Sequence, residues 1–279
     1  MTDSFAQNNV GVRTDFHMHT HGSFDGRDTA LRMGETADER GIERIALTDH
    51  CDIDCIEAGI YPPYYPEKIR AEIDEAREKC RCGILYGIEL GQGYLCREAS
   101  EKLLRENEYD YVLGSVHNLE GVPDFGYLHY EFMPRAATAD LYRRYLDDIL
   151  TLVRWEKCDT IAHIGYPIRY ITRAGAKLTD PERFEEQLRR IFEEMIRRET
   201  VLEINTSGLR AVEKFTMPNN DILSIYRDCG GKLITFGSDA HSSDDLGKGI
   251  AEAAQTAKEL GFTDYVVFGR GHKRELRPL

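Results

Sequence analysis

Short apolar runs alternate with longer amphipathic stretches over most of the chain. The short runs predict strands at Val12–Phe16, Glu43–Thr48, Ile84–Glu89, Tyr111–Val116, Thr160–His163, Val201–Asn205, Lys232–Phe236 and Tyr265–Phe268. The stretches between them carry apolar residues at helical spacing and predict helices at Asp28–Arg40, Pro66–Lys79, Ala99–Asn107, Ala139–Lys157, Asp180–Arg198, Asn219–Cys229 and Leu246–Leu260. The pattern is therefore a repeated strand–helix alternation.

Local signals support several of these boundaries. Asp180-Pro181 is typical of an N-cap followed by proline at the first helical position. Thr138 or Ala139 is expected to begin the helix predicted at Ala139–Lys157. Glycines suited to a left-handed C-terminal position follow three predicted helices, at Gly41, Gly230 and Gly261.

Repeated strand–helix units imply parallel strands with helices outside, in either a closed barrel or an open doubly wound sheet. An open nucleotide-binding sheet usually carries a glycine-rich turn after its first strand, and no such turn follows Phe16. In a barrel, functional groups collect at the carboxyl ends of the strands.

Composition describes an ordinary globular protein, with 279 residues, 41% hydrophobic and 30% charged. No apolar run is long enough to span a membrane, and the polar stretch Met1–Asn9 lacks a signal pattern. The seven cysteines form no CxxC pair, so we expect reduced thiols in a cytoplasmic protein. The sequence leaves homo-oligomerisation open.

The net charge of −13 disfavours a nucleic-acid partner, because such a surface repels phosphates. Basic pairs in the helix near Arg190 and Arg197 are interleaved with glutamates, which is typical of an ion-paired, solvated helix. A local pocket for one small phosphate is still compatible with this charge.

Ionisable residues stand at the ends of seven successive predicted strands, and six of the nine histidines fall there. His17 and His19 point to the same side of a strand because they are two residues apart. Any one of these histidines alone is more often structural than a ligand. Together they predict a divalent-metal site of imidazole and carboxylate groups, suited to Zn, Mn or Fe. The absence of cysteine from these positions argues against a closed structural zinc site.

The ordered motifs DFHMH, the later Asp25, TDH, GIELG, GSVHNL, AHIGYPIRY, LEINTSGLR and GSDAH resemble those of the PHP (polymerase and histidinol phosphatase) superfamily. Within it, the chain resembles the monofunctional histidinol-phosphate phosphatases. The resemblance covers residues from about 13 to 245. It implies a single α/β domain over residues 1–279, a distorted (βα)7 TIM-like barrel of about 12–260, with an accessory C-terminal strand within about 262–279.

The resemblance also implies a cluster of two to three divalent metals. His17, His19, Glu89 and Asp239 would hold one metal, and Glu89 would bridge to a second held by His117 and His163. The third metal would take Asp25, His50 and His241. Many relatives have histidine where this chain has Asp25, so the third site is where the chain departs from the family pattern.

By the same resemblance, a hydroxide bridging two metals would attack the phosphorus atom. Arg169 is the expected phosphate clamp, although in isolation it reads as a surface arginine in a loop, and Arg210 is a second candidate. The candidate catalytic residues are Arg169, Asp239 and His241.

Glu203 and Asn205 are candidates for the substrate's ammonium or imidazole group, or else fasten the barrel rim. Asp15 and Asp49 are expected to orient ligands from behind. The proline-rich segment starting at Tyr61 is expected to form a loop over the barrel mouth.

The expected function is hydrolysis of L-histidinol phosphate to L-histidinol and phosphate, in histidine biosynthesis. One alternative is a related phosphoesterase acting on another phosphomonoester or on a nucleotide phosphodiester. Another is a non-catalytic PHP domain, but such domains lose ligands, whereas all nine expected positions here hold competent ones.

Overall fold

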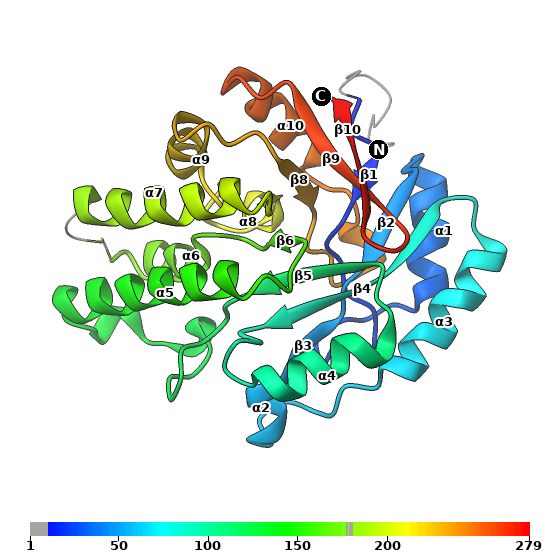
Figure 1. Ribbon diagram of the computed structural model, residues 1–279, viewed down its shortest axis with the longest axis horizontal. Coiled ribbons are helices and arrows are strands. Elements are labelled where there is room, and N and C mark those ends of the chain that lie inside the picture. Colours follow the sequence, from blue (N-terminus) through cyan, green and yellow to red (C-terminus); the bar gives the residue numbers. More distant parts are fainter. Residues whose placement is uncertain (1–10, 177, 179–180) are drawn as a thin grey trace.

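The computed structural model describes residues 11–176, 178 and 181–279 (Figure 1). Met1–Asn9 and the expected N-cap Asp180 lie outside the described residues. In the described part, seven parallel strands follow one another in the order β1 (Thr14–Asp15), β2 (Arg44–Leu47), β4 (Gly83–Gly91), β5 (Tyr111–Ser115), β6 (Thr160–Ile161), β7 (Val201–Asn205) and β8 (Ile234–Gly237).

The chain segments around β1 and β8 close this sheet into a barrel. The amide of Phe16 donates to the carbonyl of Phe236 at 3.0 Å, and the amide of Asp239 donates to the carbonyl of His17 at 2.7 Å. Met18 and Ala240 continue the contact as a parallel bridge. The predicted α/β fold, a distorted seven-stranded barrel with helices outside, is confirmed.

Each strand predicted from the sequence is present, with ends shifted by no more than a few residues. The three-residue strand β3 (His50–Asp52), which pairs with β4, was not predicted. The last predicted strand lies within β9 (Asp264–Gly269), which pairs with β10 (Lys273–Pro278) in a separate antiparallel hairpin.

The predicted helices are also present: α1 (Ala30–Arg40), α3 (Pro66–Lys79), α4 (Arg97–Asn107), α5 (Arg135–Trp155), α7 (Pro181–Arg197), α9 (Asn220–Asp228) and α10 (Ile250–Glu259). The expected start of α5 at Thr138 or Ala139 is wrong, because the helix begins directly after Pro134. Helix α10 begins later than Leu246, since Gly247 and Gly249 adopt positive φ and interrupt the helix. Short helices α2 (Ile53–Glu57), α6 (Tyr166–Arg173) and α8 (Ser207–Arg210) were not predicted.

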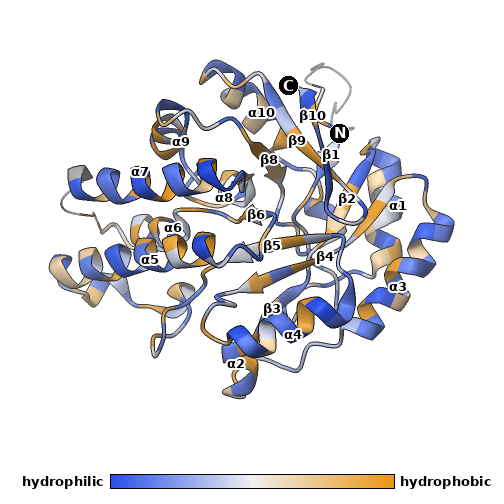
Figure 2. Cartoon of the chain, viewed as in Figure 1, coloured by the Kyte–Doolittle hydropathy of each residue, from blue (hydrophilic) through white to orange (hydrophobic). Residues whose placement is uncertain are grey.

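The helices pack around the outside of the barrel, with α1 against α3 and α7 between α5 and α9 (Figure 1). Their polar faces look outward, while the strands inside are largely apolar (Figure 2). The 14-residue helix α3 illustrates the local cause: proline begins it, and Ile69, Ile73 and Ala76 form one buried stripe. Of the described helices, none combines the length and apolarity needed to cross a bilayer.

The β9–β10 hairpin closes the barrel at the end where its strands begin. Phe268 lies inside, with its ring centroid 5.5 Å from that of Phe16 and 4.6 Å from that of Tyr111. At the entrance to β2, Arg44 donates to the carbonyl of Phe268 at 2.7 Å. The aromatic residues thus fill the barrel interior at the end where the strands begin.

We expect Phe268→Ala to lower the free energy of unfolding by about 3–5 kcal/mol, because it removes a buried ring at the barrel base. Urea denaturation measures this change. Leu276→Ala, in the same hairpin but 59% exposed, is the matched control and should cost less than about 1 kcal/mol. Equal losses for the two variants would contradict a plugging role for Phe268.

Candidate metal centre

A cavity of ≈ 290 Å³ opens at the carboxyl ends of the barrel strands. Eight residues singled out in the sequence line it: Asp25, His50, Glu89, His117, His163, Arg169, Asp239 and His241. His17 and His19 lie directly beneath, each fully buried. The barrel therefore brings all nine expected metal ligands to one place.

Glu89 lies at the centre of this arrangement, near the end of β4, and its side chain is buried. Its Oε2 atom is 3.3 Å from Nε2 of His17, 3.5 Å from Nε2 of His19 and 2.8 Å from Nδ1 of His50. Its Oε1 atom is 3.1 Å from Nε2 of His117 and 2.9 Å from Nε2 of His163. One carboxylate thus faces five imidazoles from four strand ends.

The first group consists of His17, His19, Glu89 and Asp239. Nε2 of His17 lies 3.1 Å from Nε2 of His19, and Oδ1 of Asp239 lies 3.6 and 3.4 Å from these two nitrogens. Ligands at zinc-like bond lengths in a tetrahedron are about 3.3–3.6 Å apart. The spacing of this group fits one divalent metal.

The second group consists of Glu89, His117 and His163. Nε2 of His117 lies 3.4 Å from Nε2 of His163, so these nitrogens and Oε1 of Glu89 form a nearly equilateral triangle. Because the first group uses Oε2 of Glu89, the two groups share this carboxylate through different oxygens. That arrangement suits a bridging ligand.

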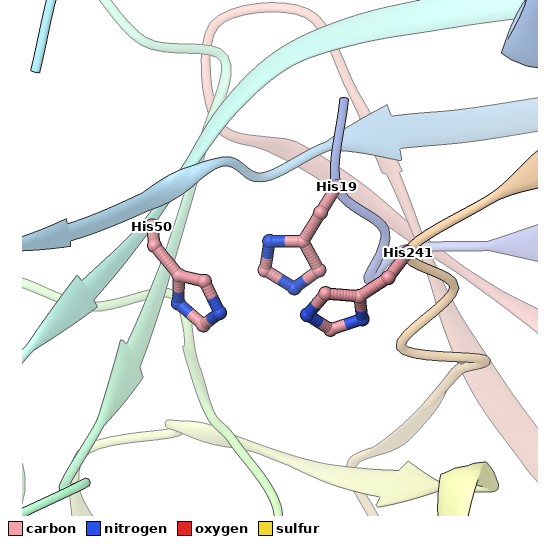
Figure 3. A group of neighbouring side chains, drawn as sticks. All are labelled: His19, His50 and His241. Carbon is pink, nitrogen blue, oxygen red and sulfur yellow. The ribbon is translucent and has the colours of Figure 1, made fainter. Parts of the chain in front are cut away.

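The third group is more open. Nε2 of His241 lies 3.1 Å from Oδ2 of Asp25, whereas Nε2 of His50 is 3.8 Å from Oδ1 of Asp25. The His19 ring stacks between His50 and His241, with both centroid distances 4.2 Å (Figure 3). His50 therefore faces both Asp25 and Glu89, and Asp25 is the most exposed ligand candidate, with 39% of its side chain accessible.

Electrostatics in this region keep the candidate ligand carboxylates ionised. Partial burial raises the pKa of Asp25, but the hydrogen bond to His241 and the charges of His50 and His241 lower it to about 2. Burial likewise raises the pKa of Glu89, yet the surrounding imidazoles bring it well below its ordinary value. Burial and the charges of His50 and His241 lower the pKa of His19 well below the usual range, which favours the neutral ligand form.

Two buried atoms at the centre make no hydrogen bond with good geometry, namely Oε2 of Glu89 and Nδ1 of His50. Buried polar groups without such partners are costly, and a coordinated cation would satisfy them. Imidazole and carboxylate donors without thiolate are a ligand set suited to Zn, Mn or Fe. The residues present fit a divalent-metal cluster.

Carboxylates behind the ligands orient three of the imidazoles. Oε1 of Glu203 lies 2.7 Å from Nδ1 of His17, and Oδ1 of Asp52 lies 2.8 Å from Nδ1 of His117. Asp49 acts on His19 through Ser23, whose hydroxyl donates to Asp49 at 2.8 Å and lies 3.1 Å from Nδ1 of His19. These contacts leave each Nε2 atom directed at the centre.

Asp15 secures the barrel closure beneath the site and also contacts a candidate ligand, because its Oδ1 atom accepts the amide of His17 at 3.4 Å. Its two carboxylate oxygens accept the amides of Ser238 and Gly247, both at 2.8 Å. Burial raises the pKa of Asp15, while these amide hydrogen bonds lower it.

The expected substrate-binding residues lie in different surroundings. Arg169, on α6, lines the cavity; its Nη1 atom donates to the hydroxyl of Ser207 at 3.4 Å, and its Nε atom lies 3.6 Å from Oε1 of Glu213. Arg210 does not line the cavity and donates to the carbonyl of Asp239 at 3.3 Å.

Glu203 and Asn205 also lie outside the cavity wall. Glu203 accepts the amide of His163 at 2.8 Å in addition to its contact with His17, and Asn205 accepts the amide of Ser207 at 3.0 Å. Their positions correspond to fastening the barrel rim, the second of the two roles considered for them.

The cavity also contains residues that the sequence did not single out as functional: Phe24, Asp52, Asp124, Gly126, Tyr127, Tyr166 and Tyr170. Asp52 follows the TDH motif by two residues and could have been noticed as a neighbour. Asp124 lies in a long connection with no periodic pattern and gave no such signal. Tyr61, from the predicted mouth loop, lines the cavity. Its ring stacks on that of Phe24, with the two ring centroids 4.2 Å apart.

Comparisons with known proteins agree with this geometry. The sequence profile of the PHP domain matches residues 15–207. A probable histidinol-phosphatase of Clostridium acetobutylicum is 28% identical over 88% of this chain and 92% of that protein. The histidinol-phosphatase of Lactococcus lactis is 26% identical over 92% of this chain and 94% of that protein.

Two solved structures have the same fold. The crystal structure of Lactococcus lactis histidinol phosphate phosphatase, complexed with zinc, L-histidinol and phosphate, matches with a TM-score of 0.80 and 24% identity over 95% of this chain and 99% of that one. A putative histidinol phosphatase from Listeria monocytogenes matches with a TM-score of 0.72 and 18% identity over 86% and 99% of the two chains.

We expect Glu203→Gln to weaken zinc binding by about 10- to 100-fold, because it removes the carboxylate that holds the His17 ring. Competition with a chromophoric chelator measures the dissociation constant. Glu213→Gln is the matched control, since the side chain of Glu213 is equally buried but, among the described residues, its ion pairs are with Arg169 and Arg173. Unchanged zinc affinity in Glu203→Gln, or equal loss in both variants, would refute the orienting role.

Proposed function

Because the chain belongs to the PHP domain family, we propose that it is a metal-dependent phosphomonoesterase that hydrolyses L-histidinol phosphate to L-histidinol and phosphate. The match of the PHP profile over well more than half of the chain establishes the family. The sharing of Glu89 between two groups of imidazoles is the single observation that carries the proposed chemistry. The curated relatives named as histidinol-phosphatases support the choice of substrate.

The residues fit two to three divalent ions of the Zn, Mn or Fe type. His17, His19 and Asp239 would hold one ion, His117 and His163 a second, and Glu89 would contact both. Asp25, His50 and His241 would hold the third. When bound, such ions neutralise charge on phosphate oxygens and lower the pKa of a coordinated water.

Arg169 supplies the protein's own cation at the cavity wall. Its planar guanidinium can bind two phosphate oxygens as a fork. The side chain of Glu213 is fully buried and lies 3.6 Å from Nε of Arg169, so it restrains the guanidinium from behind. Arg169 lines the same cavity as the candidate ligand histidines, so its guanidinium can reach a phosphate bound there.

The size and charge of the site favour a small phosphate ester. A cavity of ≈ 290 Å³ accommodates a metabolite but not a folded nucleic acid. The net charge of −13 also opposes a polyanion. The presence of all nine candidate ligands around the cavity separates this chain from a barrel retained only for binding.

The proposal is tested by steady-state hydrolysis of L-histidinol phosphate beside a panel of other phosphomonoesters, with zinc- or manganese-loaded protein. The highest kcat/KM is expected for histidinol phosphate. Activity on the panel without activity on histidinol phosphate would refute the substrate but leave the phosphatase chemistry. No activity on any ester would refute both.

We expect Arg169→Ala to raise KM for histidinol phosphate by about 10- to 100-fold, because a charged hydrogen-bond donor to the phosphate is lost. Metal content, measured by mass spectrometry, should not change. Arg173→Ala is the control, since Arg173 contacts the same Glu213 from the same helix but does not line the cavity. A KM that is unchanged in Arg169→Ala, or raised equally in the control, would rule out the clamp.

A further inference from the structure

Asp124 is distinct among the carboxylates that line the cavity. The other four, Asp25, Asp52, Glu89 and Asp239, each contact at least one histidine. Within the described residues, the side-chain hydrogen bonds of Asp124 are those of Oδ1, which accepts the Gly126 amide at 2.6 Å and the Tyr166 hydroxyl at 3.4 Å. The metal cluster therefore leaves this carboxylate unused.

The loop around Asp124 is held in place by its neighbours. Phe125 is fully buried, its ring lies 5.5 Å from that of Tyr145 on α5, and its amide donates to the carbonyl of His117 at 2.9 Å. Asp124 itself caps the single-turn helix η1 (Phe125–Tyr127) through the Gly126 amide. The carboxylate is thus preorganised at the cavity wall, in a loop tied to one of the candidate metal ligands.

Tyr166 connects Asp124 to the metal centre. Its ring centroid lies 5.0 Å from that of His163 and 5.4 Å from that of His117, while its hydroxyl reaches Asp124. The distance from the second group of ligands to Asp124 is therefore about the length of one tyrosine side chain. A short molecule can therefore contact the second group of ligands and Asp124 at once.

We propose that the Asp124 carboxylate binds the ammonium group of the substrate and that the adjacent aromatic wall receives its planar imidazole ring. This assignment rests on the proposed function and names the part of the site that selects histidinol phosphate among phosphate esters. Histidinol phosphate is dipolar, with an anionic phosphate and a cationic amine separated by two carbons. The lining of the cavity supplies partners for both charges, with Arg169 and the candidate metal ligands for the phosphate and Asp124 for the amine.

The aromatic side chains near Asp124 complete this half of the cavity. Tyr61, Tyr127 and Tyr170 line it, and the hydroxyl of Tyr170 donates to that of Tyr166 at 2.8 Å. Flat aromatic rings stack favourably on imidazole and attract ammonium groups. Burial raises the pKa of the Asp124 carboxyl, and a bound ammonium would offset that cost by pairing with the charged form.

Asp124→Asn tests the assignment with two matched substrates. In this variant, kcat/KM for histidinol phosphate should fall on the order of 10- to 100-fold, because a charge-assisted hydrogen bond is lost. Hydrolysis of the des-amino analogue 3-(imidazol-4-yl)propyl phosphate, which also releases a primary alcohol but has no amine, should be nearly unchanged. 2-Aminopropyl phosphate, which keeps the amine in place and lacks the ring, should lose activity as histidinol phosphate does.

Product inhibition gives a second readout, because it measures how tightly each product binds and not how fast histidinol phosphate is hydrolysed. The inhibition constant of L-histidinol should rise in Asp124→Asn, while that of inorganic phosphate should not change. Glu131→Gln, an exposed neighbour in the same loop, is the matched control and should match the wild type in every assay.

The assignment would be overturned if Asp124→Asn lost equal activity on histidinol phosphate and on its des-amino analogue, or if it kept the wild-type preference between these two esters. A raised inhibition constant for phosphate as well as for L-histidinol would also overturn it. Wild-type protein that hydrolyses histidinol phosphate, combined with an insensitive Asp124→Asn variant, would refute this inference alone. Wild-type protein inactive on histidinol phosphate would refute the proposed function together with it.

Discussion

The contact on which the whole site depends is that of one buried carboxylate, Glu89, with five imidazoles. A carboxylate at this depth is stable only when positive charge or strong donors surround it. The surrounding imidazoles bring the pKa of Glu89 well below its ordinary value, and their Nε2 and Nδ1 atoms converge at distances suited to coordination. Crowding these ionisable groups together costs free energy by itself. Divalent cations bound between them would offset that cost.

The barrel makes this convergence possible by dividing its interior into layers. Phe268, Phe16 and Tyr111 fill the base, Glu203 lies above them and orients His17, and the cluster around Glu89 occupies the top. Helix α6 then adds Arg169, and the loop before η1 adds Asp124, as charges of opposite sign in the cavity wall. Stability is thus concentrated at one end of the barrel and chemistry at the other, as in other barrel enzymes.

Much of this arrangement could be predicted from the sequence because strand ends are local features. Each histidine of the cluster follows a recognisable apolar run, so its placement required only the general rule for parallel barrels. The contact of Glu203 with His17 could not be predicted, because the two side chains meet only through the barrel's closure. Asp124 was missed because it depends on a long connection held by Phe125, and β3 was missed because three residues carry too little periodicity.

The most direct test of the account is to measure bound metal and histidinol phosphate hydrolysis together in the wild type and in Glu89→Gln. The wild type should bind at least two transition-metal ions per chain and hydrolyse the ester. Glu89→Gln, of nearly the same size, should lose metal from both groups that share the carboxylate and lose activity with it. A Glu89→Gln protein that retained full metal content and full activity would contradict the central role of this carboxylate.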